Sequence, residues 1–305
     1  MTLSAQPGKG VIGVAEAMAA ATAEIDAVLQ TLLPEPSGPE RRLAEAMRYA
    51  VLAPGKRFRP VLALSTAELF SVPRRAALRV AVAVEFAHTY SLVHDDLPCM
   101  DDDDMRRGQP SLHKQYDEAT AVLAGDALLP LAFEVMAHPE THADAEVRLE
   151  LVRALAEAAG PRGMVGGQMI DLVVEHKPAD IGTITRMQQL KTGALISFAC
   201  EAGAVLGKAP ASARQALKAY ARDLGLAFQI VDDLLDVEGT EAATGKKVGK
   251  DATLGKATFV ALLGPERART QATMLADQAV AHLDAFGERG AFLRRLARFV
   301  VQRSH

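Results

Sequence analysis

The chain has 305 residues, of which 49% are hydrophobic and 24% charged, a composition that excludes a disordered or fibrous protein. Its 34 basic and 38 acidic side chains leave a formal net charge of -4, which argues against a general nucleic-acid or membrane-surface binder. Two cysteines, Cys99 and Cys200, cannot build a disulfide framework or a cysteine-cluster zinc site, so a reducing cytoplasm is the expected setting.

Segments rich in alanine, leucine, glutamate and arginine follow one another along the chain, and the period-two alternation of strands is hard to find. Proline and glycine residues separate these segments and are expected to begin or end helices, as at Pro54, Pro98 and Pro265. We therefore expect an all-α fold, with residues 1–305 forming a single large bundle of about ten helices. No apolar run reaches the roughly 18 residues of a membrane-spanning helix, and no leader sequence is expected.

Four segments are apolar on most faces and should form the core of the bundle. They are residues 78–94, 119–136, 190–206 and 216–235. The flank at residues 11–33 and the charged segments after Pro265 are amphipathic, which predicts that they cover the outside.

An acidic cluster, D-D-L-P-C-M-D-D-D-D, begins at Asp95 and closes the first apolar segment. Negative charge at a helix C-terminus is opposed by the helix dipole, so the cluster predicts a bound cation. On a continuous helix Asp95 and Asp101 would be about 240° apart. Pro98 disfavours helix at Leu97 and lets the chain fold back, which would bring both carboxylates to a common metal. A solvated acidic loop and a weak calcium site remain alternatives.

A second acidic cluster, Q-I-V-D-D-L-L-D, ends the apolar segment 216–235. Asp232 and Asp236 are four residues apart, about 40° around a helix, so both carboxylates point the same way. An exposed helix end is the alternative interpretation. Carboxylate ligands select hard cations, and Mg²⁺ keeps waters and bridges to phosphates. Together the two clusters predict a diphosphate ligand.

Basic side chains that could complete a diphosphate site lie near both clusters. Lys191 with Thr192 opens an apolar segment, and a further basic group, G-K-R-F-R-P, precedes the first cluster at residues 55–60. His88 lies about two helical turns before Asp95. The alternatives are solvated surface cations and, for His88, a core histidine. The cations nearest the acidic clusters are Arg106, Arg107, Lys246, Lys247, Lys250 and Lys256.

These motifs resemble those of the trans-isoprenyl diphosphate synthases, most closely the bacterial farnesyl diphosphate synthases. The resemblance runs from about residue 55 to 258 and includes A-G-D-A-L, G-G-Q-M-I-D-L, K-T-G and G-K-K-V-G-K-D besides the two acidic clusters. It implies the isoprenoid synthase fold, a cytoplasmic homodimer with a deep central cavity in each all-α subunit. It also implies condensation of isopentenyl diphosphate with dimethylallyl or geranyl diphosphate to give farnesyl diphosphate. No nucleic-acid partner and no membrane span are expected.

The resemblance also assigns roles to residues. It implies three Mg²⁺ ions in each active site, replaceable by Mn²⁺, with metal ligands from Asp95, Asp96, Asp101, Asp232, Asp233 and Asp236. The allylic diphosphate would be held by Arg106, Lys191, Thr192, Gln229, Lys246 and Lys256. Isopentenyl diphosphate would be held by Lys56, Arg59, His88 and Arg107. Lys191, Thr192 and Gln229 are the expected catalytic residues.

Tyr90 lies five residues before Asp95, about 7.5 Å deeper along a helix, and would form the floor that limits product length. Packing of Tyr90 elsewhere in the core is the alternative. A geranyl or geranylgeranyl diphosphate synthase would share every motif except this floor. A terpene cyclase would not need the second phosphate-binding group formed by Lys56, Arg59 and His88. A non-catalytic regulatory subunit could lose residues of the second acidic cluster, whereas in this chain that cluster is complete.

Overall fold

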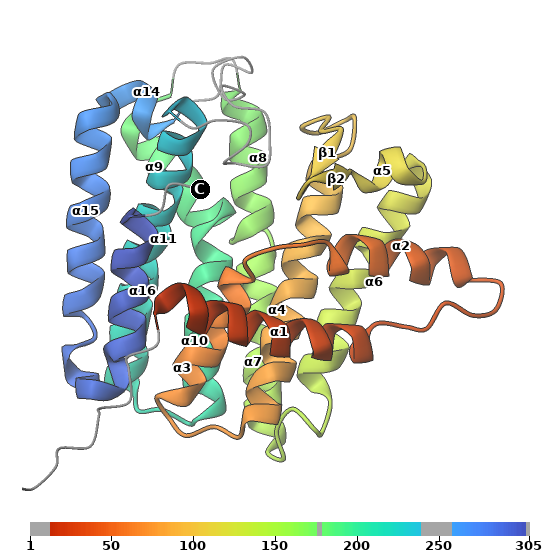
Figure 1. Cartoon of the computed structure of the whole chain (residues 1–305), viewed down its shortest axis with the longest axis horizontal. Coiled ribbons are helices and arrows are strands. Elements are labelled where there is room, and N and C mark those ends of the chain that lie inside the picture. The colour runs from red at the N-terminus through yellow and green to blue at the C-terminus, as the bar shows by residue number, and fades with distance from the viewer. Residues whose placement is uncertain (1–12, 176–178, 239–257, 303–305) are drawn as a thin grey trace, which may run out of the picture.

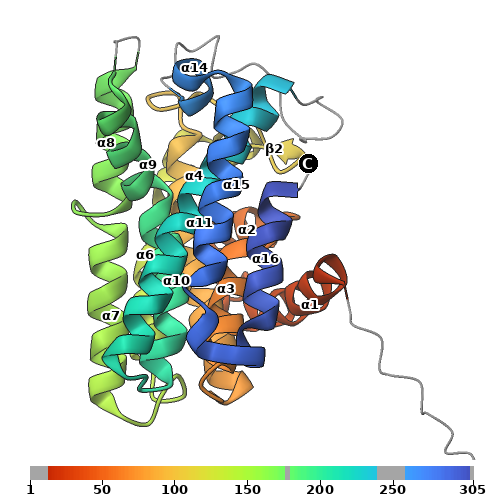
Figure 2. The ribbon, with the colours of Figure 1, turned by 90° about the vertical axis from the view of Figure 1, so that its left-hand side faces the viewer.

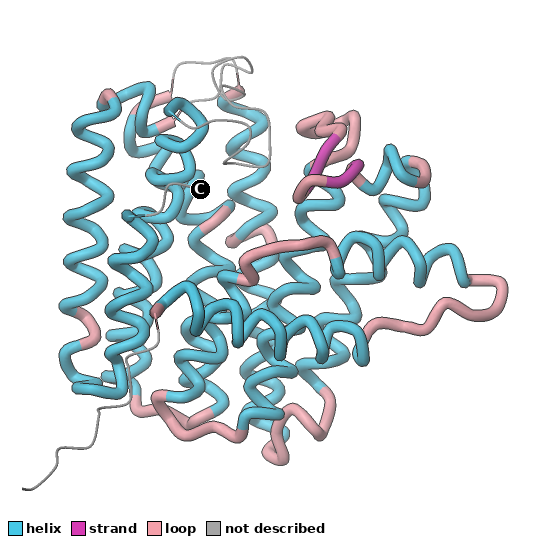
Figure 3. Tube along the Cα trace, in the orientation of Figure 1, coloured by secondary structure: helices cyan, strands magenta, loops and turns pink. Residues whose placement is uncertain are grey.

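The computed structural model describes residues 13–175, 179–238 and 258–302 (Figure 1). The expected all-α fold is confirmed, and Figure 3 shows that the strands of the described chain are confined to one small hairpin. Before this hairpin come α1 (Val14–Leu32), α2 (Arg41–Leu52), α3 (Phe58–Glu68) and α4 (Arg74–Asp95), and the hairpin itself is β1 (Met105–Arg106) and β2 (Gln109–Pro110). After it come α5 (Leu112–Gln115), α6 (Glu118–Ala137), α7 (Ala145–Ala159), α8 (Met164–Val174), α9 (Ile181–Lys191), α10 (Gly193–Leu206), α11 (Ala211–Glu238), α14 (Phe259–Leu263), α15 (Pro265–Ala281), η1 (Asp284–Gly290) and α16 (Ala291–Gln302).

Local sequence explains where several helices begin. Asp117, Asp144 and Asp180 each accept a hydrogen bond from a backbone N–H of the helix that follows, and Thr258 does the same for α14. Such caps satisfy backbone donors that have no partner within the helix. Pro265 stands in the first turn of α15, where a missing N–H costs nothing.

The core lies where the four apolar segments were expected. The inner helices α4 and α6 pack along each other, and α10 packs on α3 and α11 (Figures 1 and 2). Gly203 of α10 lies so close to α3 that an added Cβ would stand 2.3 Å from the backbone nitrogen of Ala67. A side chain at this position would push the two helices apart.

The helix expected over residues 190–206 begins three residues later than predicted, as α10. Residues 190–206 read as a single apolar helix, but α9 ends at Lys191 and α10 begins at Gly193. Thr192 between them has φ -107° and ψ -47°, and its N–H still bonds to the carbonyl of Gln188. Glycine is a poor helix former, which favours a break at this point. The break places Lys191 and Thr192 at helix ends.

Two helices, α4 and α6, are long and apolar enough by length and composition to cross a membrane. As expected from the sequence, no uninterrupted apolar run reaches this length, because charged side chains such as Glu85 in α4 and Asp126 in α6 interrupt both helices. The apolar stretch of α4 is 67% buried within the protein and that of α6 is 44% buried. Since the two helices pack on each other as core helices, neither is a clear membrane span.

The C-terminal ends of α4 and α11 lie at the same end of the bundle, together with the β1–β2 hairpin and α14 (Figures 1 and 2). The first acidic cluster follows α4, and the second closes α11. The fold therefore gathers both acidic clusters at one end of the molecule.

Candidate active site

The first acidic cluster folds back on itself as the position of Pro98 predicts. Helix α4 ends at Asp95, and the backbone N–H of Asp101 donates to the carbonyl oxygen of Asp95 over 2.8 Å. A straight helix would have carried Asp101 to another face. The backbone thus brings Asp101 next to Asp95, and a common metal between their carboxylates stays a prediction.

The electrostatics of Asp95 favour a cation beside it. Burial raises the pKa of Asp95 to about 6, with Asp101 and Asp96 raising it further and Lys191 and Arg106 opposing the shift. A carboxylate that is desolvated next to other carboxylates gains from a positive charge at the same place. An all-oxygen donor set of this kind fits Mg²⁺, which prefers carboxylates and water.

Asp96 is buried at 2% exposure and accepts a hydrogen bond from Arg106 Nε over 2.9 Å. Arg106 also reaches Asp103, over 3.2 Å. Burial raises the pKa of Asp96, and the hydrogen bond from Arg106 acts in the opposite direction. In this structure Asp96 therefore positions Arg106 at the base of the hairpin.

The second acidic cluster occupies the last turns of α11. Asp233 is buried at 3% exposure, and its carboxylate accepts from Gln188 Nε2 over 3.3 Å and from Gln229 Nε2 over 3.0 Å. Its Oδ2 also accepts from the backbone N–H of Phe259 over 3.3 Å. Asp233 thus joins α9, α11 and the start of α14. On the same helix Asp236 is buried and Asp232 is half-buried.

The expected catalytic residues form part of the same network. Thr192 Oγ1 donates to Gln229 Oε1 over 2.8 Å, so the hydroxyl is held by the residue that also contacts Asp233. Lys191 Nζ lies 2.6 Å from Asp171 Oδ2 of α8. Asp171 is a partner that the sequence reasoning missed, although it stands within the G-G-Q-M-I-D-L motif.

Arg59 and His88 lie together on the facing sides of α3 and α4. Arg59 Nη1 is 3.1 Å from His88 Nε2. Burial lowers the pKa of His88 well below its usual value, and the surrounding arginines lower it further, so the neutral ring accepts the hydrogen bond from Arg59. Burial also lowers the pKa of Arg59 to about 10.

Two donors in this region are buried and have no hydrogen-bond partner among the residues that the structure describes: Arg59 Nε and Arg107 Nη1. A buried guanidinium N–H without a partner is costly, and an anion between the two arginines would satisfy both. Lys56, the remaining expected member of this group, is exposed. The donor arrangement fits a phosphate.

Two further residues that support this region were not assigned from the sequence. Glu85 is buried at 1% exposure, and its Oε1 accepts from Arg57 over 2.7 Å and from Arg107 over 3.0 Å. Arg57 also donates to Asp26 of α1 over 2.8 Å. The signal for Glu85 was a lone carboxylate in the apolar segment 78–94.

A cavity of about 470 Å³ connects these groups. It reaches from Arg59 and His88 past Asp95, Lys191 and Thr192 to an apolar wall that includes Tyr90. Tyr90 is half-buried, and its ring meets that of His94 edge-on at 5.1 Å. The volume lies in the usual range for small-molecule sites. Other apolar lining residues are Leu97, Val122, Met164, Val165, Met169, Leu172 and Leu195.

The expected lysines after the second cluster, Lys246 and Lys256, lie outside the described residues. Of the remaining expected site residues, Arg59, His88, Tyr90, Asp95, Lys191 and Thr192 line the cavity. Asp96, Asp233, Arg107 and Gln229 contact side chains around it.

Comparisons with known proteins identify relatives of this chain. A family model described as "Polyprenyl synthetase" matches residues 40–285. The farnesyl diphosphate synthase of Geobacillus stearothermophilus is 42% identical over 92% of this chain and 95% of its own length.

Two solved structures are also similar. The crystal structure of an FPP/GFPP synthase from Zymomonas mobilis is 53% identical, with a TM-score of 0.86 over 94% of this chain and 98% of that one. A geranyltransferase from Helicobacter pylori, complexed with magnesium and isoprenyl diphosphate, is 31% identical, with a TM-score of 0.83 over 96% of this chain and 98% of that one. The matched family model spans most of the chain, and the relatives cover nearly all of it. The chain belongs to the polyprenyl synthetase family.

Proposed function

We propose that this protein condenses isopentenyl diphosphate with an allylic diphosphate, dimethylallyl and then geranyl diphosphate, to give farnesyl diphosphate. The observation that carries the proposal is the single cavity that joins Arg59 and His88 to Asp95, Lys191 and Thr192 and ends in an apolar wall. A reaction between two diphosphate esters with hydrocarbon tails needs two polar subsites and one apolar pocket. The similarity to the Geobacillus farnesyl diphosphate synthase supports the same activity.

The isopentenyl diphosphate subsite would consist of Lys56, Arg59, His88 and Arg107. The unpartnered donors of Arg59 and Arg107 support this assignment. A neutral His88 adds no charge of its own and fixes the orientation of Arg59. Guanidinium groups bind phosphate oxygens with two parallel hydrogen bonds, which suits a subsite that works without metal.

The allylic diphosphate subsite would lie between the two acidic clusters. We assign the metal ligands to Asp95, Asp101 and Asp232, with Asp96, Asp233 and Asp236 supporting them. Mg²⁺ is the proposed cation, in three ions with Mn²⁺ as a substitute, and the Helicobacter pylori structure was solved with magnesium. When bound, Mg²⁺ would neutralise the charge that develops on the departing diphosphate. Arg106, Lys191, Thr192, Gln229, Lys246 and Lys256 would hold the diphosphate oxygens.

The side chains around the cavity would then separate charge and exclude water. Lys191 and Arg106 offer positive charge to the leaving diphosphate. The C-terminal end of α9 at Lys191 brings the negative end of a helix dipole to the allylic cation. Thr192 is oriented by Gln229, and Gln229 by Asp233, so this chain of hydrogen bonds holds the site rigid. The double bond of isopentenyl diphosphate attacks the allylic cation, and the released diphosphate can accept the proton lost afterwards.

Tyr90 is the proposed floor of the hydrocarbon pocket. It lines the cavity on α4, about 7.5 Å below Asp95 at 1.5 Å per residue. A second product range is favoured by one observation: the 53% identical protein from Zymomonas mobilis is described as a synthase of both FPP and GFPP. This observation favours an alternative product longer than fifteen carbons, such as geranylgeranyl diphosphate, and does not support the geranyl alternative.

We also propose that the enzyme is a cytoplasmic homodimer. Leu123 on the outer side of α6 is 58% exposed, and Val122 beside it lines the cavity. An apolar side chain on a surface next to the active site would be covered by a second subunit.

The direct test is an incubation with Mg²⁺, isopentenyl diphosphate and dimethylallyl or geranyl diphosphate, followed by chromatography of the dephosphorylated products. A fifteen-carbon alcohol as the main product supports the proposal. Asp232→Ala should lower turnover by orders of magnitude because a metal ligand is lost. A product of another length would shift the assignment to the alternative, and no condensation at all would refute the proposed function.

A further inference from the structure

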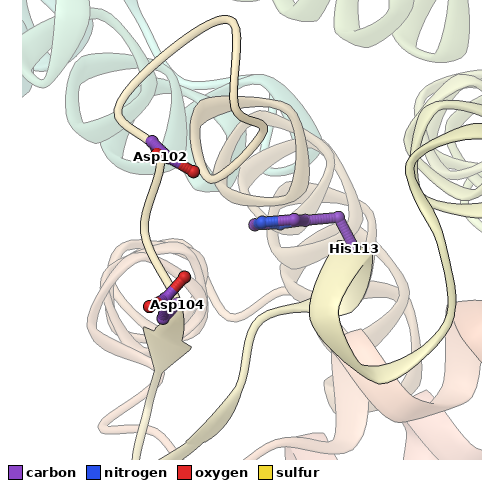
Figure 4. Close-up of side chains that lie close together, drawn as sticks. All are labelled: Asp102, Asp104 and His113. Atoms are coloured by element: carbon purple, nitrogen blue, oxygen red, sulfur yellow. The ribbon is translucent and has the colours of Figure 1, made fainter.

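Three metal-ligating side chains meet outside the carboxylates assigned to the allylic diphosphate. Asp102 and Asp104 come from the loop that leads into β1, and His113 comes from α5 (Figure 4). Their ligand atoms all lie within 4.8 Å of one another. Figure 4 shows the ring of His113 pointing between the two carboxylates. We call these three residues the hairpin cluster.

The environment of His113 points independently to a ligand. The side chain is buried, at 7% exposure, yet its Nε2 has no hydrogen-bond partner in the part of the chain that the structure describes. Its other ring nitrogen, Nδ1, lies 3.2 Å from Ser111 Oγ. If Nδ1–H donates to Ser111, the lone pair of Nε2 is directed at Asp102 and Asp104. A hydrogen bond from the far ring nitrogen commonly orients a metal-binding histidine in this way.

The backbone already holds these residues near the right positions. The N–H of Ser111 donates to the carbonyl oxygen of Asp104 over 2.9 Å, which ties the chain before His113 to the acidic loop. The N–H of Asp102 donates to the carbonyl oxygen of Leu97 over 3.2 Å. With the backbone held in this way, the three ligand atoms already lie within 4.8 Å of one another.

Lys114 is a cation in direct contact with the cluster. Lys114 Nζ lies 2.9 Å from Asp104 Oδ1, and its side chain is 45% exposed. The ammonium group would repel a metal ion and compete for Asp104, but its exposure allows it to move away into solvent. Removing Lys114 should therefore strengthen metal binding.

We propose that Asp102, Asp104 and His113 form a separate site for a first-row divalent transition metal such as Zn²⁺ or Co²⁺. An imidazole with two carboxylates suits such ions, whereas Mg²⁺ prefers oxygen ligands alone. Three protein ligands leave coordination positions for water. A metal here would clamp α5 to the loop, and so fix the hairpin that carries Arg106. This proposal goes beyond the prenyl transfer reaction and does not depend on it.

The test is calorimetric titration of the full-length protein with Co²⁺ in the presence of excess Mg²⁺, which occupies sites made of oxygen ligands. We expect Co²⁺ to bind to the wild-type protein and His113→Gln to lower the Co²⁺ affinity by more than about tenfold. Loss of a residue that only hydrogen-bonds to a metal ligand already lowers metal affinity about tenfold or more, and loss of the ligand itself should cost more. Asp102→Asn should weaken binding similarly. Because Asp102 is exposed, this variant tests the cluster even if His113→Gln does not fold.

Two control variants separate the hairpin cluster from general acidity. Asp103→Asn removes the same charge between the two ligands and should leave Co²⁺ affinity unchanged. Lys114→Gln should raise it. Co²⁺ should also increase the thermal stability of the wild-type protein and of Asp103→Asn, and should not increase that of His113→Gln. Absence of Co²⁺ binding under excess Mg²⁺, or equal affinity in His113→Gln and Asp102→Asn to that of the wild type, would overturn the proposal.

Discussion

Arg107 donates a hydrogen bond to Glu85 Oε1 over 3.0 Å, and this contact joins the β1–β2 hairpin region to a carboxylate buried within α4. The same oxygen accepts from Arg57, which in turn reaches Asp26 of α1. Arg57 and Arg107 therefore converge on one buried carboxylate, and Arg57 links that carboxylate to α1. The position of Arg107, which we assign to isopentenyl diphosphate, depends on that charge.

Glu85→Gln should destabilise the protein and weaken isopentenyl diphosphate binding. Removing one partner of a buried ion pair leaves an uncompensated charge, which costs about 3–5 kcal/mol. Urea denaturation should show this loss. In steady-state kinetics the KM for isopentenyl diphosphate should rise more than the KM for the allylic substrate, because Arg107 loses its anchor.

Glu68→Gln is a matched control for this prediction. Glu68 pairs with Arg74, but its side chain is 61% exposed. An exposed ion pair contributes at most about 1 kcal/mol, so the control should change stability little. Equal effects of the two variants would contradict the importance assigned to burial of Glu85.

Asp95→Asn should stabilise the metal-free protein while it removes activity. The pKa of Asp95 is raised from 3.8 to about 6, so the folded state binds the proton more tightly than the unfolded state. This contribution to stability is present below pH 3.8 and is lost as the pH rises through about 6. At pH 8 the charged Asp95 should cost on the order of 1–3 kcal/mol, which the asparagine avoids.

The measurement is the Tm of wild-type and Asp95→Asn protein at pH 5 and pH 8, with chelator and then with Mg²⁺ and pyrophosphate. Without metal the variant should gain on the wild type as the pH increases. With Mg²⁺ and pyrophosphate the order should reverse, because only the wild type has the full ligand set. A lower Tm of the metal-free variant at pH 8 would refute the electrostatic argument.

The sequence was most informative where a feature is local. The fold-back of Asp101 onto Asp95 follows from one proline in a short acidic stretch, and the helical positions of Tyr90 and His88 follow from their spacing. The all-α fold follows from the abundance of helix-forming residues and from the prolines and glycines that separate the segments. A helix start near Lys191 and Thr192 was also predicted, but α10 begins at Gly193 and Lys191 still belongs to α9.

Contacts between distant segments could not be predicted in this way. Glu85 meets Arg57 and Arg107, which lie 28 and 22 residues away along the chain, and no local pattern encodes that pairing. Similarly, Asp171 meets Lys191 only because α8 packs on α9. Such partners are fixed by helix packing, which depends on the shapes of many side chains at once.

Two glycines show this packing dependence, and the first is Gly125 of α6. A Cβ at this position would lie 2.1 Å from His94 Nε2, which is 3.0 Å from the carbonyl oxygen of Val122. Gly125→Ala should displace the His94 ring and cost about 1 kcal/mol, the value of the lost hydrogen bond. Chemical denaturation of Gly125→Ala, His94→Ala and the double variant should give strongly non-additive losses. Additive losses would show that the ring does not occupy this space.

Gly167 of α8 should be far less tolerant. Its added Cβ would meet the backbone nitrogen of Lys191 at 2.1 Å, and a backbone atom cannot swing aside as a ring can. Gly167→Ala should therefore separate α8 from α9, cost about 3 kcal/mol or more and displace Lys191 from the cavity. Denaturation and turnover, measured beside Gly125→Ala, test the contrast. A Gly167→Ala enzyme with normal stability and turnover would contradict the role given to this contact.

Tyr90→Ala should lengthen the product. Tyr90 and Val122 both line the cavity, and truncation at Tyr90 removes the largest side chain below Asp95 on the α4 wall. The growing chain could then extend past α4 toward α6, so products longer than fifteen carbons should appear in chromatograms of the dephosphorylated mixture. Tyr116→Ala removes the same side chain outside the cavity and should leave the product distribution unchanged. Identical distributions for wild type and Tyr90→Ala would place the length limit elsewhere, and His94, whose ring contacts Tyr90, would be the next residue to truncate.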